Sequence, residues 1–332
     1  MHVLIIGAAG MIGRKLTGRF ARAAEMGGRP VERLSLVDVE APEKPLGFAG
    51  NVSVSSLDIG DRAAVERCLA ARPDVIFDLA AIVSGEAEAD FEKGYRVNLD
   101  GTRHMLEAVR QESAKAPYRP RFVFTSSIAV FGAPFPAVIG DEFFNTPLTS
   151  YGTQKAMSEL LLADYTRRGF LDGIAIRLPT ICIRPGKPNK AASGFFSNIL
   201  REPLVGQEAL LPVSEDVRHW HASPRAAVGF LTHAASMDLE PLGARRALTM
   251  PGLSATVAEQ IDALRRVAGD KAVQLIRREP DPVIAKIVAG WPRAFDAQRA
   301  LALGFRADAS FDEIIRIHIE DELDGRIPVT SC

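Results

Sequence analysis

The chain has 332 residues and an almost even charge balance, with 40 Lys and Arg residues, 41 Asp and Glu residues and a formal net charge of -1. A surface without an excess of one sign has no long-range attraction for nucleic acid or for an anionic membrane, so we exclude those partners and expect a small-molecule substrate. Apolar residues make up 47% of the chain, which is typical of a soluble globular protein with one large domain or two modest ones.

Apolar runs in the sequence are short. The stretch from 75 to 83 is interrupted by Asp78, whereas a membrane-spanning helix needs about 20 apolar residues. The first residues form a strand-like run and then reach glycines, unlike an apolar leader with a cleavage site. The three cysteines are odd in number and far apart, which favours reduced thiols over a disulfide framework. We therefore expect no membrane span, no signal peptide and a cytoplasmic protein.

Strand-length apolar runs alternate with helical patterns through the first half of the chain, which is typical of βαβ units. The expected strands cover residues 3–6, 33–37, 52–57, 75–79, 121–126 and 173–178. The expected helices cover about 11–25, 61–71, 91–113 and 151–168, and the last two carry apolar residues at three- and four-residue spacing. We therefore predict an α/β fold with a doubly wound (Rossmann) parallel sheet.

The regular pattern ends after Pro179, where prolines at 185, 188, 203 and 212 interrupt the chain. We expect a smaller, discontinuous substrate-binding lobe there, formed by residues 179–224 and 251–325. A helix at about 225–237 and a strand at 245–250 return to the main sheet. The predicted sheet domain therefore comprises residues 1–178 together with 225–250.

A glycine-rich turn, GAAGMIG, follows the first expected strand. Gly7 allows a tight turn, Gly10 allows the backbone to approach a pyrophosphate, and Gly13 allows the helix to pack closely on the strand. The helix that begins at Met11 and continues through Ile12 directs its free N–H groups and positive dipole end at the phosphates. Because the turn joins the first strand to the first helix, it predicts a dinucleotide site and not merely a turn.

Asp38 ends the second expected strand, where a carboxylate can accept hydrogen bonds from both hydroxyls of an adenine ribose. A 2′-phosphate would meet that carboxylate, and the next residues, Val39 and Glu40, offer no cation. The sequence therefore favours NAD over NADP; the alternative is that Asp38 only caps a loop. Asp58 and Ile59 follow the third strand and are expected to flank the adenine, with the Asp58 carboxylate accepting from the exocyclic amine.

Tyr151 and Lys155 are four residues apart in YGTQK, with Ser150 as the expected N-cap of a helix. This spacing places both side chains on one face of the helix. A free tyrosine has a pKa near 10, so a base at neutral pH needs a shift of about 3 units, or roughly 4 kcal/mol. One cation about 4 Å away at an effective dielectric constant of about 20 supplies energy of that order. We predict Tyr151 as the acid/base and Lys155 as the cation that also holds the nicotinamide ribose.

Ser127 follows the fifth strand, at the edge where a doubly wound sheet binds its ligand. Its hydroxyl can hold the substrate oxygen against the Tyr151 phenol. Ser126 is a second candidate for substrate contact, although in a regular strand it faces the other side.

Together, GAAGMIG, Asp38, TSSIAVFG and YGTQK resemble the extended short-chain dehydrogenase/reductase family, which includes sugar epimerases and dehydratases. The resemblance covers nearly the whole chain. It implies that Ser127, Tyr151 and Lys155 are the catalytic residues.

The same resemblance implies further contacts. Asn98, in RVNLDGT, matches an asparagine that shapes the active-site helix and its water chain in that family. Pro179 is expected at the cofactor, as is the turn after the fourth strand, which contributes Leu79, Ala80 and Ala81. Family members often form homodimers by pairing the two helices near 91–113 and 151–168 into a four-helix bundle, so we expect a homodimer.

Two departures from the family pattern bear on the substrate. Nucleotide-sugar members usually have Arg-x-x-Asn before the small lobe, whereas this chain has RLPT, with Thr180 in place of the asparagine. Phe131 replaces the usual tyrosine of the serine motif. Both count against a nucleotide sugar.

Three stretches, IVSGEAEADFEKGYRVN, RLPTICIRPGKPN and IVAGWPRAFD, resemble members that oxidise C2 of four-carbon sugar acids with NAD. A short hydroxy acid needs a cation for its carboxylate and partners for its hydroxyls. We expect Arg184 to bind the carboxylate, with Arg218 and Lys187 as rivals, and Ser84 and Thr180 to bind hydroxyls. The alternatives are a nucleotide-sugar epimerase or dehydratase with tightly bound NAD, and a nicotinamide-sensing protein that has lost the chemistry.

His219 and His221 lie two residues apart in an expected strand. Without further ligands nearby, we interpret them as pocket or surface residues and expect no metal site. Trp291 with Pro292 is expected to serve packing.

Overall fold

The computed structural model describes residues 1–186 and 192–328, which form two compact units. The first unit consists of Met1–Val130, Pro147–Leu178 and Val228–Thr249. The second consists of Phe131–Thr146, Pro179–Ala227 and Met250–Cys332 as far as these are described.

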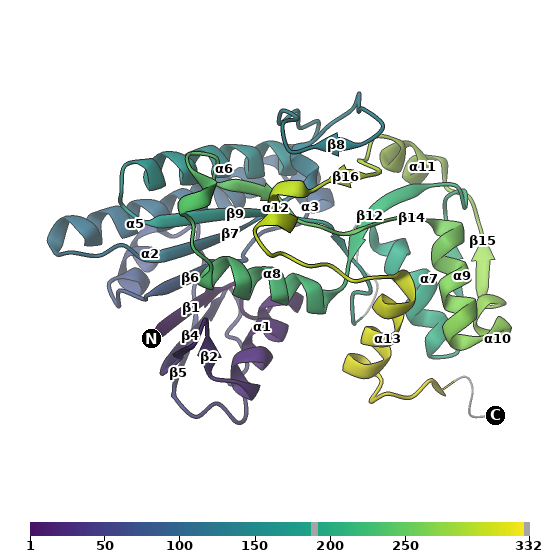
Figure 1. Cartoon of the computed structure of the whole chain (residues 1–332), viewed down its shortest axis with the longest axis horizontal. Coiled ribbons are helices and arrows are strands. Elements are labelled where there is room, and N and C mark those ends of the chain that lie inside the picture. The colour runs from purple at the N-terminus through teal and green to yellow at the C-terminus, as the bar shows by residue number, and fades with distance from the viewer. Residues whose placement is uncertain (187–191, 329–332) are drawn as a thin grey trace. The chain divides into compact units, whose positions relative to one another are not determined.

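A seven-stranded sheet forms the centre of the first unit, and every neighbouring pair is parallel. Across the sheet the order is β13 (Ala247–Thr249), β9 (Asp172–Leu178), β7 (Arg121–Ser127), β6 (Val75–Asp78), β1 (His2–Ile6), β4 (Arg33–Asp38) and β5 (Asn51–Ser56) (Figure 1). The chain order reverses between β1 and β6, and doubly wound sheets bind their ligands at such a switch point. The α/β class with a Rossmann-like sheet is confirmed.

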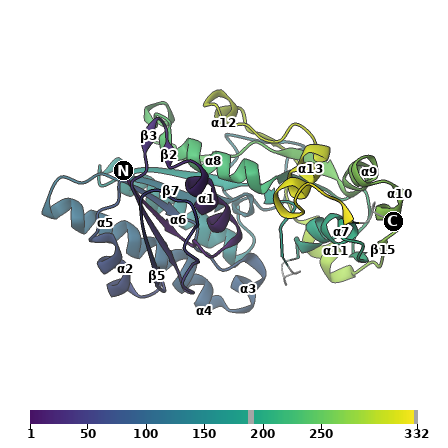
Figure 2. The ribbon, with the colours of Figure 1, turned by 90° about the horizontal axis from the view of Figure 1, so that it is seen from below.

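Helices cover both faces of this sheet (Figure 1, Figure 2). On one face, apolar side chains of α2, α5 and α6 pack on Leu4, Ile6 and Phe122. On the other, Phe20 of α1 lies 6.3 Å from Phe77, measured between ring centroids. The helices are α1 (Met11–Arg22), α2 (Arg62–Leu69), α3 (Ser84–Ala89), α4 (Phe91–Gly94), the π-helix η1 (Tyr95–Gly101), α5 (Thr102–Lys115) and α6 (Ser150–Arg167).

Smaller elements complete the first unit. They are the hairpin strands β2 (Glu25–Met26) and β3 (Arg29–Pro30) and the 3-10 turns η2 (Ile128–Val130) and η3 (Glu240–Leu242). Helix α8 (Pro224–Ser236) contributes residues to both units.

The second unit contains three small sheets around its own core. They are β10 (Thr180–Ile181) with β12 (Arg218–Ala222) and β14 (Leu253–Thr256), β11 (Ala209–Leu211) with β15 (Ile276–Arg278), and β8 (Ile139–Gly140) with β16 (Phe295–Asp296). The helices are α7 (Gly194–Leu204), α9 (Val257–Ala268), α10 (Asp270–Val273), α11 (Pro282–Ala289), α12 (Gln298–Ala302) and α13 (Phe311–Glu322). Apolar side chains of α7, α9 and α13 form its core. Among the described helices of the chain, none is long and apolar enough to cross a bilayer.

The structure corrects three expectations about the elements. The single helix expected at 91–113 is divided into α4, η1 and α5. Residues 131–146 belong to the second unit, because β8 pairs with β16 there. The N-cap of α6 is Thr149 and not Ser150, because the Thr149 side chain accepts a hydrogen bond from the Gly152 N–H.

Candidate active site

The glycine turn is held so closely that a side chain would not fit. Gly7 has φ +87°, and a Cβ there would lie 2.7 Å from the Ala80 nitrogen. A Cβ on Gly13 would lie 2.2 Å from the Gly7 oxygen. Helix α1, of which Met11 and Ile12 are the first residues, has Gly10 as its N-cap, with no side chain capping it and no acidic residue in its first turn. The positive helix end and its N–H groups are therefore suited to hold a pyrophosphate.

Asp38 lies against this turn. Its Oδ2 accepts a hydrogen bond from the Ala9 N–H at 2.9 Å, and its Oδ1 accepts one from the Val39 N–H at 2.7 Å. The carboxylate therefore does cap the loop, as the alternative reading held. Each carboxylate oxygen has a second lone pair, so the same group can also accept from ribose hydroxyls.

Asp58 and Ile59 are engaged within the protein. Asp58 accepts hydrogen bonds from Arg96 at 2.7 Å and from the Gly60 N–H at 2.8 Å. Burial favours a higher pKa for Asp58, but these hydrogen bonds outweigh it and the pKa is lowered. Ile59 is only 4% exposed, its side chain packs in the sheet core, and its carbonyl lies 3.1 Å from His104 Nδ1.

Asn98 ties the π-helix to the turn after β6. Its Oδ1 accepts from the Ile82 N–H at 2.9 Å, and its Nδ2 donates to the Ile82 carbonyl at 3.1 Å and to Gln154 Oε1 at 2.8 Å. Gln154 belongs to α6, between Tyr151 and Lys155. The side chain of Asn98 therefore joins α6 to the segment after β6. This segment contains the predicted cofactor residues Leu79, Ala80 and Ala81 and leads to the predicted substrate residue Ser84 at the start of α3.

Ser127, Tyr151 and Lys155 lie on adjacent elements of the first unit. Ser127 ends β7, and its Oγ accepts from the Ala129 N–H at 3.1 Å. Gly152 allows the first turn of α6 to approach, because a Cβ there would lie 2.1 Å from the Ala129 oxygen. The sequence signal for this contact is the glycine that directly follows Tyr151.

The Lys155 side chain is buried beneath this site. Its Nζ donates to the Thr125 carbonyl at 2.8 Å and lies 5.8 Å from the centroid of the Tyr151 ring. Burial lowers the pKa of Lys155 to about 8, although the negative charges of Asp78 and Glu159 oppose the shift. Burial in turn raises the pKa of Asp78 to about 6, while Lys155 acts to lower it.

A buried ion pair joins α6 to β9 near the predicted catalytic residues, and the sequence did not predict it. Glu159, one turn after Lys155, accepts from Arg177 Nε at 2.9 Å and from its Nη2 at 2.7 Å. Ser126 donates its hydroxyl proton to Glu159 Oε1 at 2.5 Å. That proton is therefore committed within the protein, which weakens the expectation that Ser126 binds substrate. A glutamate four residues after Lys155 was the one available signal.

In the second unit, Thr180 Oγ1 lies 2.7 Å from His219 Nε2. Arg184 is held by hydrogen bonds from Nε to the Ile181 carbonyl at 3.1 Å and from Nη2 to Ser193 Oγ at 3.2 Å. Burial, and to a smaller extent the positive charge of Arg184, lowers the pKa of His219, the partner of Thr180.

Two other cations, Arg218 and Lys187, were rivals for the substrate carboxylate. The Arg218 charge is paired with Glu259 at 3.2 Å. Lys187 lies outside the described residues.

Both histidines are buried, which corrects the surface interpretation. His219 is 2% exposed and His221 is fully buried. Burial lowers the pKa of His219 to about 4, and burial also lowers that of His221. Trp291 packs on His219, with ring centroids 5.3 Å apart. Over the described ranges, no group of three or more metal-ligating side chains is arranged to hold an ion.

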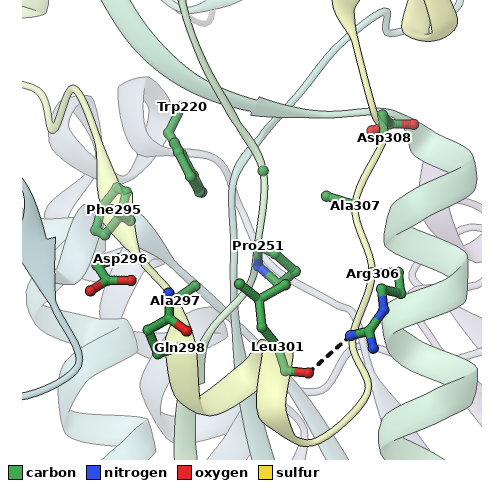
Figure 3. Close-up of a pocket in the computed structure, with 11 residues that line it drawn as sticks. Trp220, Pro251, Phe295, Asp296, Ala297, Gln298, Leu301, Arg306, Ala307 and Asp308 are labelled. Atoms are coloured by element: carbon green, nitrogen blue, oxygen red, sulfur yellow. Dashed lines mark hydrogen bonds between the residues drawn. The ribbon is translucent and has the colours of Figure 1, made fainter.

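A separate cavity of about 360 Å³ lies within the second unit. Trp220, Phe295 and Asp308 are among the residues that line it, and Arg306 donates to the Leu301 carbonyl at its edge (Figure 3). None of the residues predicted from the sequence lines this cavity. The predicted catalytic residues lie instead at the edge of the main sheet.

Comparison with known proteins identifies the family and relatives that match along nearly the whole chain. The model of the NAD dependent epimerase/dehydratase family matches residues 3–227. A D-erythronate dehydrogenase from Cupriavidus necator is 48% identical over 97% of this chain and 98% of its own length. A D-erythronate dehydrogenase from Haemophilus influenzae is 42% identical over 97% of this chain and 100% of its own.

Solved structures add two comparisons. A protein from Agrobacterium tumefaciens, described as a nucleoside-diphosphate-sugar epimerase, is 66% identical with a TM-score of 0.97, over 98% of this chain and 96% of that chain. The L-threonine dehydrogenase from Clostridium difficile has a TM-score of 0.84 at 22% identity over 98% of both chains, so the likeness shows the fold alone.

Proposed function

Because the chain belongs to the NAD dependent epimerase/dehydratase family, we propose that it is an NAD-dependent dehydrogenase that oxidises the C2 hydroxyl of D-erythronate or a closely similar sugar acid. The observation that carries the proposal is the grouping of Ser127, Tyr151 and buried Lys155 at the sheet edge that also bears the glycine turn. Two relatives along the whole chain are D-erythronate dehydrogenases.

Ser127, Tyr151 and Lys155 each have a role in this reaction. NAD, held at the glycine turn and Asp38, would supply the acceptor for the hydride of C2. Ser127 holds the C2 oxygen, and the Tyr151 phenolate takes the hydroxyl proton as the carbonyl forms. The Lys155 ammonium stabilises that phenolate, since a cation close to the ring lowers the phenol pKa. The products are the 2-oxo acid, NADH and one proton, so atoms and charge balance.

Further residues bind the cofactor and the substrate in this proposal. Gly7, Gly10, Gly13 and Asp38 bind NAD, and Thr180 and Arg184 contact the substrate in addition to Ser127 and Tyr151. Thr180 binds a substrate hydroxyl, and the Arg184 guanidinium binds the carboxylate. The separated cysteines support a cytoplasmic location, and exposed apolar residues on α6, such as Leu160 at 70% exposure, support a homodimer through α5 and α6.

An NAD-reduction screen tests the proposal. The purified protein is mixed with NAD and a panel of four- and five-carbon aldonic acids, and NADH formation is followed by absorbance. We expect turnover with D-erythronate. Failure of every acid in the panel would refute the proposal.

The second candidate is a nucleotide-sugar epimerase, favoured by the description of the Agrobacterium tumefaciens structure. Its NAD would be reduced and reoxidised without release. The same assay separates the two candidates, because an epimerase interconverts UDP-glucose and UDP-galactose without net NADH. Thr180, in place of the family's asparagine, favours the dehydrogenase.

A further inference from the structure

The hydrogen-bond direction between Thr180 and His219 follows from the second contact of the imidazole. His219 Nδ1 lies 2.8 Å from the Pro292 carbonyl oxygen. A carbonyl can only accept, so Nδ1 carries the proton, and the neutral ring then has a lone pair on Nε2. Thr180 Oγ1 lies 2.7 Å from this Nε2 atom. The threonine hydroxyl must therefore donate its proton to His219.

The surroundings keep the imidazole in this state. The ring is stacked on Phe196 at 5.3 Å with an interplanar angle of 4°, and Trp291 packs at 5.3 Å. Burial holds the pKa of His219 at about 4, so the ring stays neutral at physiological pH. The ring orientation is fixed by packing, and the tautomer is fixed by Pro292.

Thr180 follows directly after β9, the strand that pairs with the one ending in Ser127. Ser127, at the end of β7, pairs in register with Leu178 at the end of β9. Thr180 follows Leu178 by two residues, and two residues span at most about 7 Å. The chain therefore leaves the edge that bears the catalytic serine almost directly at Thr180.

We propose that His219 is a positioning residue that makes the Thr180 hydroxyl a pure hydrogen-bond acceptor, so that this position selects a substrate hydroxyl and rejects a carbonyl, a carboxylate oxygen or a missing group. The inference rests on the proposed function and adds a specificity rule to it. The Thr180 oxygen retains a lone pair but has no proton left to offer. The group it recognises is the C3 or the C4 hydroxyl, since the C2 oxygen is held by Ser127 and Tyr151.

Two substrate analogues and two pairs of variants test this rule. The analogues are 2,4-dihydroxybutanoate, which lacks the C3 hydroxyl, and 2,3-dihydroxybutanoate, which lacks the C4 hydroxyl. For the wild-type protein, kcat/KM should fall about 10- to 100-fold for the analogue that lacks the recognised hydroxyl, because the Thr180 acceptor, covered by the bound substrate, is left unpaired. Thr180→Val removes the acceptor with little change in volume and should bring the ratio of D-erythronate to that analogue close to 1. Thr180→Ser should keep the wild-type ratio.

The histidine pair tests the positioning role. His219→Phe keeps an aromatic ring against Phe196 and frees the Thr180 proton, so discrimination against the analogue should weaken. His219→Gln places an amide oxygen at the position of Nε2, so it should retain the discrimination against the analogue. NAD affinity and melting temperature, measured for each variant, report that the chain remains folded. Heteronuclear NMR of the His219 ring should show the proton on Nδ1.

The experiments distinguish failure of the proposed function from failure of the Thr180 inference. Absence of NADH from wild-type protein with D-erythronate would overturn the proposed function and this inference together. Turnover of D-erythronate with unchanged discrimination in Thr180→Val, or a proton found on Nε2, would overturn this inference alone.

Discussion

Removing one partner of the buried pair of Glu159 and Arg177 should strongly destabilise the first unit. The side chains are 3% and 12% exposed. Substitution of Glu159 by Gln keeps an acceptor for the Ser126 hydroxyl but removes the negative charge that the buried Arg177 guanidinium contacts through Nε and Nη2. Breaking a buried pair in this way costs about 3–5 kcal/mol in the free energy of unfolding. Replacing both residues, in Glu159→Met with Arg177→Met, removes both charges and should restore much of that loss.

Urea unfolding of the protein without added NAD measures these values. The matched control is Glu66→Gln, because Glu66 pairs with Arg62 on the surface with exposures of 36% and 60%, and exposed pairs contribute less than about 1 kcal/mol. A loss in Glu159→Gln no larger than in this control would refute the reasoning. A double variant less stable than the single one would show that the charges themselves are favourable.

Three further predictions concern the catalytic and cofactor residues. Tyr151→Phe should remove most turnover while NAD affinity, measured by calorimetry, changes little, because the phenol acts on the substrate proton; an equally active variant would disprove the assignment. Asp38→Asn should keep the hydrogen bond to the Ala9 N–H yet narrow the preference for NAD over NADP, whereas Asp38→Ala should also weaken NAD itself, and unchanged selectivity in both would contradict the ribose contact. Burial lowers the pKa of Lys155 to about 8 from its usual 10.5, so the unfolded chain holds more protons between these values and stability rises with pH in that window. The unfavourable contribution of Lys155 to the free energy of unfolding is therefore complete below pH 8. The stability of Lys155→Met relative to wild type should be highest there and decline towards pH 10.5. A difference in stability that does not change with pH would rule out this burial effect.

Local signals predicted the strands of the main sheet well, and they also produced the prediction of the catalytic residues. Strand ends were predicted to within about a residue, because short apolar runs between glycines and helical patterns define them. The glycine turn and the Tyr151–Lys155 spacing are contained in single short segments, which is why they could be found without a structure.

Sequence reasoning missed one feature that joins separate elements and two that depend on local backbone geometry. The Glu159–Arg177 pair connects α6 to β9, and no periodicity within either element reports on the other. The π-helix around Asn98 has one wider turn, which an apolar pattern cannot distinguish from an α-helix. Thr149 and Ser150 are adjacent hydroxyl residues, so the choice of cap depended on backbone geometry.

The interleaving of the two units has a consequence for biosynthesis. Strand β13 pairs with β9 at the edge of the main sheet, and it is formed by Ala247–Thr249. The first unit therefore cannot be completed until nearly three-quarters of the chain has left the ribosome. A fragment that stops at Leu178 would expose the backbone donors and acceptors of β9 as an open edge, which invites pairing with other chains. The nascent protein must keep that edge protected while the intervening residues of the second unit are still being made.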